Sequence, residues 1–154
     1  MFYELQTFLI AMTPIFELRG SIPIAIFQYN LSVPSAFIFS VLGNIFSSII
    51  ILLFLEKVST FLSQKSKFFN NFFEWLFSRT RKKYQGNYDK LKELFLVAFV
   101  AIPLPVTGAW TGSLCAFLFG IPFKKSLPLI SLGIVIAGII VTIISLGIKI
   151  IWIN

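Results

Sequence analysis

The feature that most constrains this chain is a pair of opposite charges inside an apolar run near its start. Residues 13–23 read TPIFELRGSIP and bring Glu17 and Arg19 together with two prolines and a glycine between hydrophobic segments. A charge at the centre of a membrane helix costs about 2.5–3.5 kcal/mol on insertion scales, so charged residues seldom stand there without a role. We therefore expect this stretch to be either a functional site or an ion pair that the fold requires.

The composition places the chain in a membrane rather than in water. Hydrophobic residues make up 57% of the 154 residues and charged residues only 12%, whereas soluble domains have about 45–50% and about 25%. The length suits a single membrane domain over residues 1–154. Histidine is absent and cysteine occurs once, at Cys115, which excludes a disulfide within the chain and predicts neither a metal site nor a cofactor.

Segment lengths predict two kinds of helix. The hydrophobic piece 5–16 is about 18 Å long as a helix, whereas the hydrocarbon core of a bilayer is about 30 Å thick. Broken helices are tolerated at membrane depth where they pack within protein. We predict re-entrant hairpins at residues 5–35 and 94–122, each followed by one transmembrane helix, at residues 36–56 and 126–150.

A stripe of small and polar residues lies along the first predicted transmembrane helix. Ser40, Asn44 and Ser48 recur at positions i, i+4 and i+8, so they share one face of the helix. Stripes of this kind pack helices together in lipid. Ordinary helix packing is therefore one interpretation of this face, and a surface that lines a substrate path is the other.

Residues 57–93 concentrate positive charge. Nine of the 13 lysines and arginines lie there, and aromatic and aliphatic residues recur between them at helical spacing. The pattern predicts a basic amphipathic segment in contact with membrane lipids, on the cytoplasmic side by the positive-inside rule. The basic run at residues 79–83 also suggests nucleic acid, but its position between two hydrophobic blocks favours lipid, so no nucleic-acid partner is predicted.

The second half of the chain repeats the pattern of the first at an offset of 88–90 residues. The matching positions are Pro14 and Pro103, Gly20 and Gly108, Val33-Pro34 and Ile121-Pro122, and Gly43 and Gly133. The predicted fold is an all-α integral membrane protein built as an inverted repeat, each half a re-entrant helical hairpin plus one spanning helix. Hairpins that span fully are the alternative, which places Lys124 and Lys125 outside, against the positive-inside rule.

Two motifs carry a resemblance to a known family. Residues 17–23, ELRGSIP, and residues 103–112, PLPVTGAWTG, resemble the putative small multidrug export protein family of prokaryotic membranes. That family looks like a distant relative of the DedA/VTT membrane proteins, several of which translocate lipids or lipid carriers by a proposed proton-coupled mechanism. The resemblance implies a location in the prokaryotic cytoplasmic (inner) membrane. DedA-type proteins carry charges on both hairpins, whereas no charge lies between Glu93 and Lys124, so a two-armed charged site is not carried over.

The predicted site lies where the two breaks meet. Arg19 is expected to bind an anion together with two half-helix N-termini, which Ser21 and Thr107 are expected to cap. Glu17 is the only acidic residue at membrane depth and is the candidate proton carrier, although a purely structural ion pair is the alternative. The predicted binding or coupling residues are Glu17, Arg19, Gly20, Ser21, Thr107, Gly108 and Trp110, and the predicted hairpin breaks are Pro14, Pro23, Pro103, Pro105 and Gly112.

These features predict a secondary transporter that exports or translocates an anionic or amphiphilic small molecule or a lipid carrier, with Glu17 as the candidate for proton coupling. The alternative is a non-transporting assembly or adaptor protein that acts through its basic amphipathic helix. An enzyme is not predicted, because one cysteine, one aspartate and no histidine do not form the usual catalytic pairs. Two spanning helices enclose little, so we expect a homo-oligomer, with Gly133 and Ala137 as one contact face.

Overall fold

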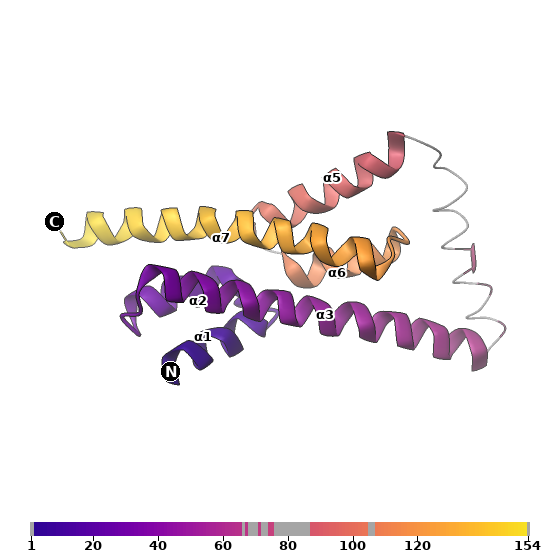
Figure 1. Ribbon diagram of the computed structural model, residues 1–154, viewed down its shortest axis with the longest axis horizontal. Coiled ribbons are helices and arrows are strands. Elements are labelled where there is room, and N and C mark those ends of the chain that lie inside the picture. The colour runs from indigo at the N-terminus through magenta and orange to yellow at the C-terminus, as the bar shows by residue number, and fades with distance from the viewer. Residues whose placement is uncertain are drawn as a thin grey trace.

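The fold is entirely helical outside its turns in the part of the chain that the computed structural model describes, residues 2–65, 67, 71, 74–75, 87–104 and 107–153. It contains α1 (Phe2–Met12), α2 (Glu17–Phe27), α3 (Val33–Lys65), α5 (Asn87–Ala101), α6 (Ala109–Leu118) and α7 (Phe123–Ile153). Each half of the chain thus places two short helices before a long one (Figure 1). The all-α prediction is confirmed for these residues, while the basic run 79–83 and Pro105 lie outside them.

The two long helices are long and apolar enough to cross a membrane. The candidate spans, Val33–Phe61 in α3 and Phe123–Ile151 in α7, have 29 residues each, which corresponds to about 43 Å at 1.5 Å per residue. α3 and α7 pack against each other and run in opposite directions (Figure 1). They form the long axis of the molecule, along which the short helices are arranged.

The long helix of the first half extends further than predicted because nothing in its sequence stops it. α3 continues past residue 56 to Lys65, and residues 45–65 contain neither proline nor glycine. α5 likewise begins at Asn87, inside the predicted basic segment 57–93. The two ends of that segment are therefore continuous with the neighbouring helices.

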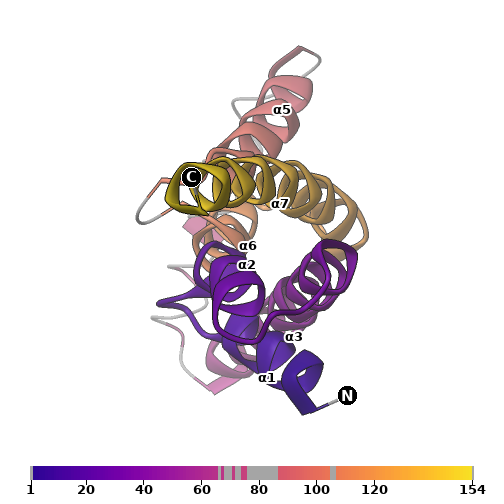
Figure 2. The same ribbon diagram turned by 90° about the vertical axis from the view of Figure 1, so that its left-hand side faces the viewer.

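The first break lies at residues 13–16, between α1 and α2, and it contains Pro14 as predicted. Pro23, by contrast, lies inside α2, so the prediction that it is a hairpin break is wrong. Gly20, predicted as a binding or coupling residue, lies in the same helix. A proline removes one backbone hydrogen bond from a helix, and the packing of α2 against α1, α3 and α7 offsets that loss. The view along the long axis shows α2 among these three helices (Figure 2).

The second break lies between α5 and α6 and contains Pro103. Gly112 lies inside α6, so the prediction that it belongs to the break is also wrong. A Cβ atom at Gly112 would overlap the side chain of Val100 on α5. This glycine therefore permits the close approach of α5 and α6 instead of interrupting a helix.

The two halves use glycine in the same way to receive their first short helix. A Cβ atom at Gly43 on α3 would overlap the carbonyl group of Phe8 on α1, and one at Gly133 on α7 would overlap Val100 on α5. α2 also packs against α7, and α6 packs against α3. Gly133 and Ala137 are both buried within the chain, so the prediction that they form an oligomer contact is wrong.

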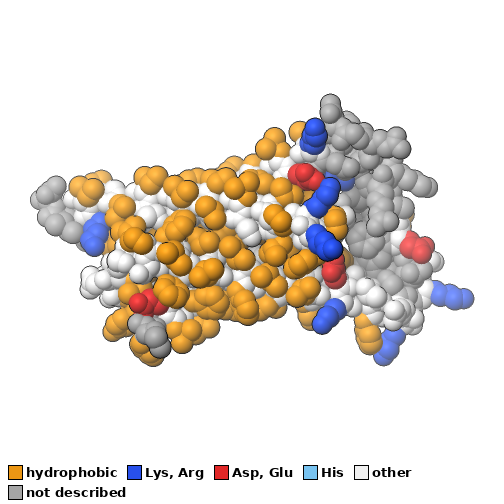
Figure 3. All heavy atoms as spheres, viewed as in Figure 1, with side chains coloured by type: hydrophobic (Ala, Val, Ile, Leu, Met, Phe, Trp, Pro, Cys, Tyr) orange, Lys and Arg blue, Asp and Glu red, His pale blue; other side chains and the backbone are white. Residues whose placement is uncertain are grey.

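The exterior of the molecule is apolar around its middle and charged at its ends (Figure 3). Large aliphatic side chains face outward, as Ile143 does with 65% exposure, whereas Asn44 and Ser48 are fully buried. At one end the starts of α5 and α7 meet, and Lys125 lies 3.5 Å from Glu93. A broad apolar surface with small polar residues inside suits a protein surrounded by hydrocarbon.

The glycine contacts predict a difference between three alanine variants. Gly43→Ala and Gly133→Ala should each lower the unfolding free energy of the purified protein in detergent by about 1–3 kcal/mol, because overpacking forces the helices apart. Gly147→Ala is the matched control, since nothing lies within 4 Å of a Cβ atom at that position of α7, and alanine favours helix. Thermal unfolding measures all three, and equal melting temperatures would contradict the close contacts.

Candidate functional site

The start of α2 contacts the second break and the start of α6 directly, through Glu17 and Arg19. The Arg19 guanidinium donates hydrogen bonds to the backbone carbonyl oxygen of Thr107 and, at 3.1 Å, to its Oγ1. Glu17 Oε1 accepts a hydrogen bond from the backbone N–H of Trp110 at 3.2 Å. These partners are 88 and 93 residues apart in the sequence. The charged start of α2 therefore holds the uncharged second break and the start of α6.

Glu17 and Arg19 also pair with each other, although they are only two positions apart. Arg19 Nη2 lies 3.7 Å from Glu17 Oε2, and the two side chains are 21% and 8% exposed. On a regular helix, residues two apart point to different faces. Glu17, however, has a φ of +48°, a left-handed conformation that is uncommon for a residue with a side chain. This turn at the start of α2 brings the carboxylate and the guanidinium together.

The Glu17 carboxylate occupies the N-terminus of α6. The N-cap residue of α6, Gly108, makes no side-chain hydrogen bond. The first N–H groups of a helix lack partners within the helix and carry partial positive charge. A carboxylate placed there stabilises the helix by about 0.3–1 kcal/mol, and by up to about 2 kcal/mol where it is partly buried. Glu17 supplies this carboxylate from the other half of the chain.

Gly108 allows the carboxylate to come this close. Its φ is +140°, a backbone conformation that favours glycine. A Cβ atom there would overlap the Glu17 carboxylate and would lie 2.9 Å from Arg19 Nη2. Any other residue at this position would have to displace the ion pair. The structure thus places Gly108 at the centre of the contact between the breaks.

Ser21 and Thr107 do not cap half-helices, contrary to the prediction. Ser21 lies one turn inside α2, where its Oγ donates to Ser40 Oγ at 2.7 Å. The Thr107 Oγ1 donates to the carbonyl oxygen of Ile102 at 2.6 Å and closes the loop that follows α5. α2 already begins at Glu17, four residues before Ser21. The Glu17 carboxylate also accepts a hydrogen bond at the N-terminus of α6, so neither helix needs one of these hydroxyl groups as its cap.

Trp110 joins the two pairs of short helices, α1 with α2 and α5 with α6, through its side chain as well as its backbone. Its indole Nε1–H donates to the carbonyl oxygen of Met12 at 3.1 Å, a contact between residues 98 positions apart. The indole is half-buried and lines a cavity beside the ion pair. Gly20 behaves differently, because the Phe16 ring covers it and it makes no contact with the second break among those the structure describes.

The cavity beside the ion pair has a volume of about 380 Å³. It is lined by Pro14, Ile15, Phe16, Glu17, Arg19, Thr107, Trp110, Thr111 and Leu114. The Thr111 Oγ1 is buried and finds no hydrogen-bond partner among the described residues. A guanidinium, a helix N-terminus and an unused hydroxyl beside an apolar wall suit a molecule with an anionic group and an apolar part.

Sequence reasoning did not single out Thr111 or decide the role of Asn44. Thr111 directly follows Trp110 in the first turn of α6, and this adjacency is the only signal that the sequence offers. Asn44 belongs to the polar stripe of α3, and the structure shows that this part of the stripe faces α2. Asn44, Glu17 and Arg19 line one small space. The stripe therefore packs helices together and also borders the ion pair.

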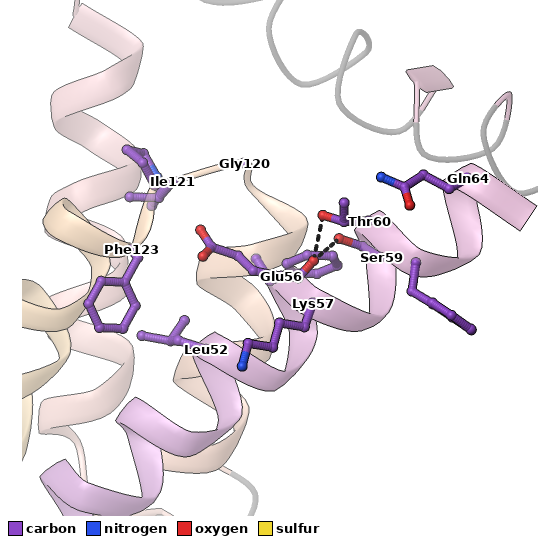
Figure 4. A pocket seen from close by; sticks show the side chains of 12 residues that line it. Leu52, Glu56, Lys57, Ser59, Thr60, Gln64, Gly120, Ile121 and Phe123 are labelled. Carbon is purple, nitrogen blue, oxygen red and sulfur yellow. Dashed lines mark hydrogen bonds between the residues drawn. The ribbon is translucent and has the colours of Figure 1, made fainter.

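A larger cavity of about 610 Å³ lies away from the ion pair, between the last turns of α3 and the turn that joins α6 to α7 (Figure 4). Its polar wall includes Glu56, Ser59 and Thr60. The two hydroxyl groups donate to the backbone carbonyl oxygen of Glu56 at 3.0 and 2.8 Å (Figure 4). Because these groups are satisfied within their own helix, we place the functional site at the smaller cavity.

The fold and the site together define a helical membrane protein in which two pairs of short helices meet through one charged pair. The chain belongs to the putative small multi-drug export protein family, whose model matches residues 17–140. The match begins at Glu17, at the start of α2, and includes the second break. The family name describes an export protein, which points to a transporter rather than to an enzyme. Comparisons with curated proteins and with solved structures give no match.

Exchanging the charges of Glu17 and Arg19 separates two contributions to stability, that of the ion pair and that of the carboxylate at the N-terminus of α6. The double variant Glu17→Arg with Arg19→Glu keeps two opposite charges but presents a cation to the N-terminus of α6. We expect both the double variant and Glu17→Ala to be about 1–2 kcal/mol less stable than the wild type in detergent. Glu17→Gln keeps an oxygen acceptor for the Trp110 N–H and should lose less. Wild-type stability of the double variant would show that the helix N-terminus contributes nothing.

Proposed function

We propose that this protein is a secondary transporter that moves an anionic or amphiphilic small molecule, or a lipid carrier with an anionic headgroup, across the cytoplasmic membrane. One observation carries the proposal. The Glu17 carboxylate lies where an anionic ligand would bind, between Arg19 and the N-terminus of α6. In this position Glu17 acts as a competitor of the substrate that is built into the chain.

Proton coupling follows from this competition. Protonation of Glu17 removes its negative charge, breaks the ion pair with Arg19 and weakens the hydrogen bond from the Trp110 N–H. The guanidinium and the free N–H groups of α6 then accept the anionic group of the substrate, while its apolar part lies along the wall of the 380 Å³ cavity. Each ligand favours the binding of the other, so proton and anion are thermodynamically linked.

The arrangement of the helices supports alternating access around this site. The short helices have 10–15 residues, which is about 15–23 Å and too short for a core of about 30 Å. This length supports re-entrant hairpins. The opposite directions of α3 and α7, and the packing of α2 on α7 and of α6 on α3, support an inverted repeat. Transporters with inverted repeats bind substrate where their broken helices meet.

The distribution of charge supports an orientation. Lys57 and Lys65 lie near the end of α3, and Lys124 and Lys125 lie at the start of α7. These two helix ends are at the same end of the molecule (Figure 1). By the positive-inside rule this end is cytoplasmic. Because two spanning helices enclose little of a substrate path, we also propose that the protein acts as a homo-oligomer surrounded by membrane lipids.

An alkyl sulfonate tests the proposal, because its charge stays constant with pH. Fluorescence of Trp110, in a variant with Trp75→Phe and Trp152→Phe, reports its binding to the purified protein. We expect the affinity to rise as the pH falls, by up to about tenfold for each pH unit over which Glu17 gains its proton. In Glu17→Gln the affinity should be high at every pH, and in Arg19→Ala it should be lost.

The cationic counterpart, an alkyl trimethylammonium ion, is the matched control. It should bind more weakly than the sulfonate, and its binding should weaken further as Glu17 becomes protonated. Preference for the cation, or an affinity for the sulfonate that ignores pH in the wild type, would refute an anion site that Glu17 controls. Proteoliposomes that contain the Glu17→Gln variant should bind the sulfonate but show no uptake driven by a pH gradient.

A further inference from the structure

Four buried polar side chains form a cluster between α2 and α3. Glu17 and Ser21 are one turn apart on α2, and Ser40 and Asn44 are one turn apart on α3; their exposures are 6%, 0%, 0% and 1%. Ser21 and Ser40 satisfy each other through a hydrogen bond of 2.7 Å. One helical turn away from that hydrogen bond, before Ser21 on α2 and after Ser40 on α3, Glu17 and Asn44 border the same small space. Ser21 and Ser40 thus satisfy each other, whereas Glu17 pairs with Arg19 and the Trp110 N–H and leaves Asn44 Oδ1 without a partner among the described residues.

The acceptor oxygen of Asn44 has no donor in this state. Its Oδ1 is buried and without a hydrogen-bond partner among the described residues. The space that it shares with Glu17 does not admit a water molecule, so water does not supply the missing donor. An ionised carboxylate is itself only an acceptor. Buried acceptors without a donor are rare in native proteins, and each requires an explanation.

We infer that Asn44 is the hydrogen-bond acceptor for the protonated form of Glu17. A carboxyl group that gains a proton becomes an O–H donor, which is the group that Asn44 lacks. In this second state the Glu17 O–H donates to Asn44 Oδ1, and the ion pair with Arg19 is broken. Asn44 is thus a positioning residue that holds Glu17 away from the anion site, and this role rests on the proposed function.

No other titratable side chain of the described residues borders this space besides Glu17 and Arg19. The remaining lining residues come from α2, α5, α7 and the start of α6, and they are Leu18, Val100, Gly108, Ala109, Ile134 and Ala137. Proton binding by Glu17 is therefore set first by its burial, which disfavours a charged group, and then by Arg19, the Trp110 N–H and Asn44. Arg19 and the N–H group favour the ionised carboxylate, whereas Asn44 favours the protonated one.

Infrared spectroscopy of the purified full-length protein tests the inference, because a protonated carboxyl absorbs apart from a carboxylate. The difference between wild type and Glu17→Gln identifies the Glu17 band during a pH titration. Asn44→Leu removes the acceptor at similar side-chain volume. We expect the Glu17 band to move to higher wavenumber, as for a carboxyl that loses a hydrogen bond. The pH of half-protonation should fall by about one unit, a tenfold loss of proton affinity.

Thr142→Val is the matched control. Like Asn44→Leu, it removes a buried polar atom that has no hydrogen-bond partner among the described residues, but Thr142 does not line this space. It should change neither the band nor the titration. An unchanged band and titration in Asn44→Leu would overturn the inference. If Asn44→Leu fails to fold, the wild-type band decides alone, since a position typical of a carboxyl without a hydrogen bond would overturn it equally.

The same titration separates this inference from the proposed function. Addition of the alkyl sulfonate should raise the pH of half-protonation if anion and proton are linked. No effect of the sulfonate, together with the expected change in Asn44→Leu, would overturn the transport mechanism and leave the role of Asn44 intact. A sulfonate effect with no change in Asn44→Leu would do the reverse.

Discussion

The contact between the Glu17 carboxylate and the N-terminus of α6 is the interaction on which the arrangement of the two halves depends. The first N–H groups of a helix lack partners within the helix, and the N-cap residue of α6 is a glycine, which has no side chain to bond them. The carboxylate that satisfies them would be costly to bury without a partner, and Arg19 provides that partner. Each group removes the cost of burying the other, but only when both halves are assembled.

Because the contact that holds the two halves together also occupies the proposed anion site, a ligand that displaces Glu17 would also change what joins the halves. Removing one member of a buried ion pair leaves an uncompensated charge, which is strongly unfavourable. In the proposed mechanism, an anionic substrate that replaces the carboxylate avoids this cost, because it supplies the charge that Arg19 and α6 require. Under the further inference, Asn44 offers the protonated carboxyl a second position. Binding and rearrangement would then be parts of one electrostatic event.

Several features of the site and the fold were predictable because they depend only on residues close together in the sequence or on their spacing. The charged pair, the two breaks and the matched glycines at positions 43 and 133 all follow from residue types and spacing. The helix starts were not predictable in this way. α2 begins before Ser21, because Glu17 has a left-handed backbone conformation. The N-terminus of α6 is capped by the Glu17 carboxylate, whose partner Trp110 is 93 residues away, and not by Thr107. Capping preferences of neighbouring residues predict neither of these contacts.

The sequence by itself determined the all-α membrane class, the two long apolar helices and the position of the charges, because composition and the length of apolar runs are properties of single segments. Only the tertiary structure decided that Glu17 caps α6, that Gly108 makes room for it and that Asn44 is left without a donor. These contacts join different helices, often about 90 residues apart. Periodicity shows which residues share a face of one helix, but not which helix that face meets.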